Sequence, residues 1–126
     1  MEYKYKIEFL KDDKGFSESE MYILELNKKS LKSKDARIKV NKITEYFRAL
    51  REYGTIIGVP AVKHIYDELY ELRPLQDRFF FFYRHENKYV ILNHFVKKSQ
   101  KTPIKEIEKA FRLIENYKRK ENNNEI

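Results

Sequence analysis

The sequence predicts an α+β domain in which two N-terminal helices and a C-terminal helix pack on an antiparallel sheet of about four strands. Residues 3–9 alternate between apolar and charged side chains, whereas residues 17–53 carry apolar side chains at helical spacing. Residues 66–97 then contain three short strand-like stretches joined by turn residues. We assign residues 1–117 to one domain, and residues 118–126 to a polar tail that we expect to be disordered.

The N-terminal half begins with a strand over residues 3–9, which has one solvent-facing side and joins the sheet. A helix capped by its first serine follows over residues 17–31. The second helix covers residues 35–53 and stops at Gly54, because glycine readily takes the left-handed conformation that ends helices. Residues 55–63 contain glycine and proline and are expected to form a loop.

The C-terminal half predicts a meander with strands over residues 66–73, 78–84 and 88–97. The run Phe79–Phe82 lacks polar interruptions, so its strand should lie in the centre of the sheet, buried on both faces. The pair Thr102–Pro103 predicts a helix start, with threonine as the N-cap and proline at the first helical position.

Composition excludes several classes of protein. Mean hydropathy is low at -0.80, yet 15% of the residues are aromatic, which is unlike a disordered chain. The chain has no cysteine, so disulfides, thiolate metal sites and a cysteine nucleophile are excluded. The N-terminus lacks the apolar segment of a signal peptide, and the apolar runs are too short to span a bilayer. We therefore expect a cytoplasmic protein.

The positive charge is concentrated in one part of the chain. The net charge is +7, and residues 73–105 hold eight basic side chains against only Asp77 and Glu86. This segment could be a solvated surface that favours solubility, or a site that attracts phosphate groups. The interleaved aromatic side chains could stack on unpaired bases or belong to the core.

Several basic residues should meet at one end of the sheet. Arg73 ends one predicted strand and Arg78 begins the next, so their guanidinium groups should be neighbours. Lys97 and Lys98 leave the last strand, and Lys101 precedes a helix N-terminus, which favours anions. Cations in this arrangement could stabilise the charge of a phosphoryl-transfer transition state, or could simply form surface ion pairs.

Catalysis, if present, is expected to need neither a metal nor another cofactor. The basic segment has too few carboxylates for a magnesium or zinc site, and a glycine-rich phosphate loop is missing. His94 shares strand parity with apolar residues, which favours a half-buried histidine with satisfied hydrogen bonds over a general acid.

Three segments resemble a known family: Leu69–Arg73, Asp77–Arg78 and His94–Pro103. Together they are similar to RelE/HigB-type toxins, in the phage-derived branch of the RelE/ParE superfamily, and the resemblance covers about residues 3–117. It implies a RelE-like fold and the toxin of a type II toxin–antitoxin pair. The implied partners are a cognate HigA-like helix-turn-helix antitoxin in a hetero-oligomeric complex, and the ribosome with its mRNA, without any membrane.

The resemblance also implies an activity, metal-free mRNA cleavage in the ribosomal A site. The ribose 2′-OH attacks the adjacent phosphorus and leaves a 2′,3′-cyclic phosphate. By this resemblance Arg73 and Arg78 bind phosphates, and Lys97 or Lys98 stabilises charge or protonates the leaving group. The general base stays open. The remaining candidates are His94 for catalysis, and Lys63, Tyr83, Arg84 and Lys101 for RNA binding; His94, Tyr83 and Lys63 are candidate bases.

Two alternatives stay open at the level of sequence. The superfamily includes ParE-like toxins that inhibit DNA gyrase by contact rather than by cutting RNA. The chain could also be an inactive, RNA-binding remnant of a phage toxin.

Overall fold

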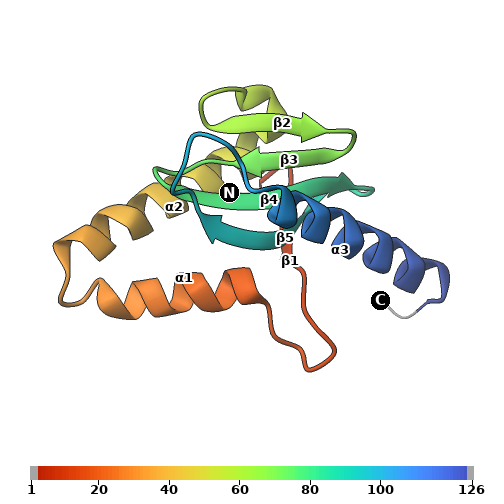
Figure 1. Cartoon of the computed structure of the whole chain (residues 1–126), viewed down its shortest axis with the longest axis horizontal. Helices are drawn as coiled ribbons and strands as arrows, with labels where there is room; N and C mark the ends of the chain where they lie inside the picture. Colours follow the sequence, from red (N-terminus) through yellow and green to blue (C-terminus); the bar gives the residue numbers. More distant parts are fainter. Residues whose placement is uncertain (1–2, 125–126) are drawn as a thin grey trace.

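The structure is a computed structural model that describes residues 3–124. Its helices lie on both faces of one sheet (Figure 1). In chain order the elements are β1 (Lys6–Phe9), α1 (Glu18–Lys29), α2 (Lys34–Tyr53), a 3-10 turn η1 (Gly54–Ile57), β2 (Val62–Tyr66), β3 (Leu69–Leu72), β4 (Asp77–Arg84), β5 (Lys88–Val96) and α3 (Ile104–Asn122).

The sheet confirms the predicted α+β class and adds detail to it. Within residues 3–124 it has five strands in the order β1-β5-β4-β3-β2. Strands β3 to β5 form the predicted three-stranded antiparallel meander, β2 extends it by one antiparallel strand, and β1 joins at the opposite edge. However, β1 pairs with β5 in parallel, so the sheet is mixed rather than purely antiparallel.

The extra strand belongs to the β2–β3 hairpin, which the sequence does not predict. Residues 62–66 form β2 and residues 69–72 form β3, where we expected a loop to residue 63 and a single strand over residues 66–73. Asp67 adopts a left-handed φ of 53° in the turn, and its carbonyl accepts a hydrogen bond from the His64 ring at 2.6 Å. Because this turn contains no glycine, its sequence lacks the usual hairpin signal.

The phenylalanine run builds both halves of the core from one strand. Phe79, Phe80, Phe81 and Phe82 are fully buried, and β4 is the middle strand of the sheet, as predicted. Because side chains alternate along a strand, Phe79 and Phe81 pack with the α2 side chains, whereas Phe80 and Phe82 pack with those of α3.

The predicted ends of α1 and α2 are largely correct. Ser17 caps α1 by accepting a hydrogen bond from the Glu20 N–H at 3.1 Å. Ser33 caps α2 in the same way through the Ala36 N–H at 3.2 Å. Gly54 ends α2 with a φ of 69°, and a Cβ there would lie 2.6 Å from the Tyr89 hydroxyl, so glycine is required.

Helix α3 differs from the prediction at both ends. Its N-cap is Pro103 rather than Thr102, and this cap makes no side-chain hydrogen bond. The helix continues to Asn122, so the expected disordered tail is wrong for residues 118–122. Glu121 explains the difference, because its carboxylate pairs with Arg84 of β4 at 2.6 Å and ties this polar turn to the sheet.

The expected tail also includes residues 125–126, which lie outside the described residues. In the part of the chain that is described, no helix is long and apolar enough to cross a bilayer.

Candidate active site

A group of basic side chains gathers on the α3 face of the sheet, where β3 ends and β4 begins. Lys63 of β2 lies opposite Glu71 of β3, and Glu71 lies opposite Phe80 of β4. Residues directly opposite one another share a face of the sheet, and Phe80 packs with α3. Arg73 lies two residues beyond Glu71 and Arg78 two residues before Phe80, so strand alternation places both on this face as well.

Glu71 is the centre of this group. Its carboxylate is fully buried, and its Oε1 lies 3.4 Å from the Arg73 Nε and 3.9 Å from the Arg78 Nε. Arg78 is also held from the other side, because its Nη1 donates hydrogen bonds to the carbonyl oxygens of Leu75 at 2.7 Å and Asp77 at 2.8 Å. The predicted proximity of the two arginines is therefore present, with Glu71 between them.

Electrostatics bring two lysines into the same group. Burial raises the pKa of Glu71, and the positive charges of Arg78, Arg73, Lys97 and Lys63 only partly counter this effect. Burial, followed by the charges of Arg78 and Arg73, lowers the pKa of Lys97. We call Lys63, Glu71, Arg73, Arg78 and Lys97 the cation cluster. Four cations face one carboxylate there, which favours a bound anion.

The cation cluster is accessible from solvent. Lys63 is exposed, Lys97 is half-buried, and the Arg73 side chain is 23% exposed, whereas Arg78 is buried beneath them. The Lys97 N–H bonds to the Gln76 carbonyl at 2.8 Å, which fixes the end of β5 beside the β3–β4 turn. A phosphate could thus approach three cations from solvent with a fourth held below.

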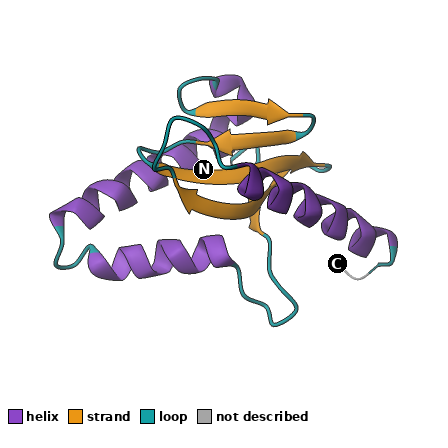
Figure 2. Ribbon diagram, in the orientation of Figure 1, coloured by secondary structure: helices purple, strands orange, loops and turns teal. Residues whose placement is uncertain are grey.

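Two further predicted residues lie in the loop of residues 97–103 that joins β5 to α3 (Figure 2). Lys98 follows Lys97 directly, and both Lys98 and Lys101 are exposed. The Lys101 carbonyl accepts a hydrogen bond from the Ser99 hydroxyl at 3.1 Å, which orders the loop locally. These lysines extend the positive surface from the cation cluster toward the start of α3.

His94 does not join the cation cluster. It is buried on the opposite face of the sheet, where its ring stacks on Tyr22 of α1 with 3.8 Å between ring centroids. Its Nε2 forms a hydrogen bond of 2.9 Å with the Asp77 carboxylate. The sheet separates His94 from the basic residues, so we remove it from the catalytic candidates.

Tyr83 and Arg84 also lie elsewhere, because they occupy the far end of β4. Arg78 and Arg84 are separated by roughly 20 Å of extended strand. Arg84 is paired with Glu121, whose hydrogen bond raises the pKa of Arg84, and the Tyr83 hydroxyl contacts Asn87. Their placement gives no support to a role beside the cation cluster.

Glu71 is the residue of this site that sequence reasoning missed, since the sequence alone indicates no more than surface ion pairs between its carboxylate and these cations. A signal was present in the strand pattern. Glu71 shares parity with Leu69, which is fully buried, so alternation places a carboxylate on a core-facing side of β3. A carboxylate at such a position needs either a partner or a function.

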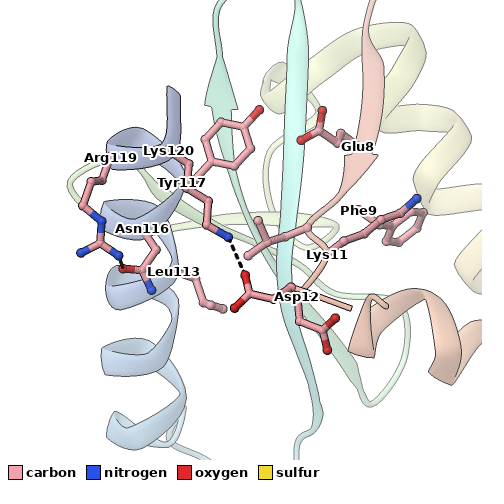
Figure 3. Close-up of a pocket in the computed structure, with 11 residues that line it drawn as sticks. Glu8, Phe9, Lys11, Asp12, Leu113, Asn116, Tyr117, Arg119 and Lys120 are labelled. Carbon is pink, nitrogen blue, oxygen red and sulfur yellow. Dashed lines mark hydrogen bonds and ion pairs between the residues drawn. The ribbon is translucent and has the colours of Figure 1, made fainter. Parts of the chain in front are cut away.

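A separate cleft of about 830 Å³ lies between the C-terminal half of α3 and the chain that leaves β1 (Figure 3). Phe9, Leu10, Leu113 and Tyr117 contribute apolar lining, and Lys120 crosses its rim to Asp13 at 3.2 Å. Because β1 and β2 are opposite edges of the sheet, this cleft is distinct from the cation cluster.

The described residues form no cluster of metal ligands. Among residues 3–124, no three His, Asp or Glu side chains gather closely enough to hold a metal ion. The cation cluster itself contributes a single carboxylate, surrounded by positive charge.

The fold and the cation cluster define a small α+β protein with a basic site at one end of its sheet. Residues 19–115, about three quarters of the chain, match the family model described as phage-derived protein Gp49-like (DUF891). The chain therefore belongs to the Gp49-like family, a family of RelE/HigB-like toxins. A search of curated proteins finds no match to this chain.

Proposed function

We propose that this protein is the toxin of a type II toxin–antitoxin pair and cleaves mRNA on the ribosome without a metal ion. The observation that carries this proposal is the cation cluster, which gathers three solvent-accessible cations and the buried Arg78 around one point. Membership of the Gp49-like family supports the toxin role.

The proposed cleavage of the RNA backbone needs the positive charges that the cation cluster provides. The 2′-oxygen attacks the adjacent phosphorus, the bond to the 5′-oxygen breaks, and the products carry a 2′,3′-cyclic phosphate and a 5′-OH. Arg73 and Arg78 would stabilise the negative charge that builds on the phosphoryl oxygens. Lys97 would donate the proton to the departing 5′-oxygen, and its lowered pKa makes it a stronger acid.

The general base must accept the proton of the 2′-OH. Of the three candidates from sequence, His94 and Tyr83 lie away from the cation cluster, and Lys63 lies within it. A helix-turn-helix antitoxin would neutralise the toxin, and the additional lysines Lys98 and Lys101 would contact RNA around the cleavage position.

The test is primer extension on a defined mRNA in a reconstituted translation system. We compare wild type, Arg73→Ala and the matched control Arg48→Ala, since Arg48 is an exposed arginine on α2. Wild type and Arg48→Ala should cut at codons in the A site, whereas cutting by Arg73→Ala should fall at least about 100-fold.

Folded wild-type protein that makes no cuts on translating ribosomes would contradict the proposal. The same preparations would then be assayed for inhibition of DNA gyrase, which tests the ParE-like alternative. Absence of growth inhibition altogether would instead favour an inactive remnant.

A further inference from the structure

Glu71 is an unusual buried charge. Its side chain is only 1% exposed, and among the described residues neither carboxylate oxygen accepts a hydrogen bond. The Nε atoms of Arg73 and Arg78 likewise have no hydrogen-bond partner there. Buried polar groups in native proteins are nearly always hydrogen-bonded, so exceptions call for an explanation.

Stability does not provide that explanation. The two distances from Glu71 Oε1, 3.4 and 3.9 Å, are longer than the roughly 2.8 Å of a charge-assisted hydrogen bond. The pair therefore gains Coulomb attraction without hydrogen bonds, while both partners lose hydration. Consistently, burial raises the pKa of Glu71, which means that the folded protein disfavours its charged form.

The geometry of the two arginines explains the buried charge of Glu71 better than stability does. Glu71 faces the Nε of each guanidinium, the nitrogen nearest the side-chain stem. An arginine held at Nε keeps donors on its terminal nitrogens. Among the described residues, the Arg78 Nη1 is the only one of these nitrogens with a hydrogen-bond partner, and it bonds to two backbone carbonyls. Without a carboxylate between them, the two guanidiniums would repel each other and move apart.

We propose that Glu71 is a positioning residue that holds Arg73 and Arg78 side by side, so that their terminal nitrogens converge on one phosphate of the RNA. This inference rests on the proposed function, because the phosphate is that of the mRNA substrate. Glu71 itself does not touch the phosphate, since it is buried beneath the cations. Its negative charge offsets the repulsion between the arginines and keeps them in place before substrate binds.

The decisive variant is Glu71→Gln, which keeps the shape of the side chain and removes its charge. Glu45→Gln is the matched control, because Glu45 is an exposed glutamate of α2 paired with Lys42 of the same helix. Single-turnover cleavage on ribosome–mRNA complexes should fall at least about 50-fold in Glu71→Gln and stay unchanged in Glu45→Gln. Binding to ribosomes carrying an mRNA with a 2′-deoxy residue at the cleavage position should change less than about threefold.

Two readouts separate positioning from a structural role. The thermal unfolding midpoint of Glu71→Gln should equal or exceed that of wild type. The Nε–H resonances of Arg73 and Arg78 in ¹⁵N NMR spectra of the toxin alone should be resolved and slowly exchanging in wild type, and should move to the solvent-exposed position in Glu71→Gln. Glu71→Asp, which retains the charge on a shorter stem, should recover part of the cleavage rate.

Three results would overturn the inference: Glu71→Gln that cleaves as fast as wild type, Glu71→Gln that loses cleavage together with its folded structure, or arginine resonances that do not respond. If wild type itself cleaves no RNA, the proposed function fails. The NMR comparison still decides whether Glu71 holds the two arginines.

Discussion

Two carboxylates lie buried at the same end of the sheet, on opposite faces, and they differ in their hydrogen bonding. Asp77 faces α1, where its Oδ1 accepts hydrogen bonds from the Tyr22 hydroxyl at 2.6 Å and from His94 at 2.9 Å. Glu71 faces α3 and, within residues 3–124, its carboxylate makes only the two long contacts with the Nε atoms of Arg73 and Arg78.

The difference shows in the pKa of each group. Burial alone would raise the pKa of Asp77, but the hydrogen bonds from His94 and Tyr22 outweigh it, and the pKa lies below the ordinary value. For Glu71, the effect of burial outweighs the charges of the four cations, and its pKa lies above the ordinary value of a glutamate. At similar burial, the charged carboxylate of Asp77 thus stabilises the fold, whereas the charged carboxylate of Glu71 opposes it. A charge that opposes folding is more readily understood as part of a functional site.

The largest effect is expected on the Glu71 face, at Lys97. Lys97→Met removes the proposed proton donor and should lower the single-turnover cleavage rate by about 100-fold. Since the donor must be protonated, the wild-type rate should fall as pH rises through the lowered pKa of Lys97. A pH–rate profile of both proteins checks this, and a wild-type profile that shows no such fall would refute Lys97 as the donor.

The next effect belongs to the Asp77 face and concerns stability. Asp77→Asn removes a charged acceptor from two donors and should lower the free energy of unfolding by about 2 kcal/mol. Urea denaturation at pH 7 measures it, with Glu71→Gln as the comparison, which should lose nothing. A larger loss in Glu71→Gln than in Asp77→Asn would break the contrast between the two carboxylates.

Tyr22→Phe should have a smaller effect of about 1.5 kcal/mol in the same assay, because it removes only one of the two donors to Asp77. Its aromatic ring can still stack on His94. A change below about 0.3 kcal/mol would show that the Tyr22 hydroxyl contributes nothing to the fold.

The pH dependence of stability separates the two carboxylates most finely. Asp77 has a lowered pKa in the folded state. Its contribution to the free energy of unfolding is therefore fully present above pH 3.8 and is lost as the pH falls through the pKa of the folded state. The difference between wild type and Asp77→Asn should therefore shrink toward zero below about pH 3.8. Glu71 has a raised pKa, so its charged form opposes folding above pH 4.5. The stability of Glu71→Gln relative to wild type should therefore increase as the pH rises above 4.5.

Most of the fold follows from local sequence signals. Serine caps, helical spacing and Gly54 place α1 and α2, and the phenylalanine run identifies the central strand. The β2–β3 hairpin is missed because its turn at Asp67 has no glycine. The parallel pairing of β1 with β5 is likewise a tertiary contact between segments about 80 residues apart, which local patterns do not specify.

The site could be predicted only in part. The concentration of basic residues indicates the end of the sheet at which the cation cluster lies, and it identifies Arg73, Arg78 and Lys97 as members of that cluster. Arg84 belongs to the same basic segment of the sequence, yet an extended strand places it at the other end of the sheet. Glu71 was passed over because a lone carboxylate among cations reads as a surface ion pair until its burial is known.

The most direct measurement is the chemistry of the RNA ends produced on ribosome–mRNA complexes by wild type and Arg73→Ala. The cation cluster predicts fragments with a 2′,3′-cyclic phosphate and a 5′-OH, which a kinase labels without prior phosphatase treatment, and almost none with Arg73→Ala. Fragments with a 3′-OH and a 5′-phosphate, or equal cleavage by both proteins, would contradict a metal-free endonuclease centred on this cluster.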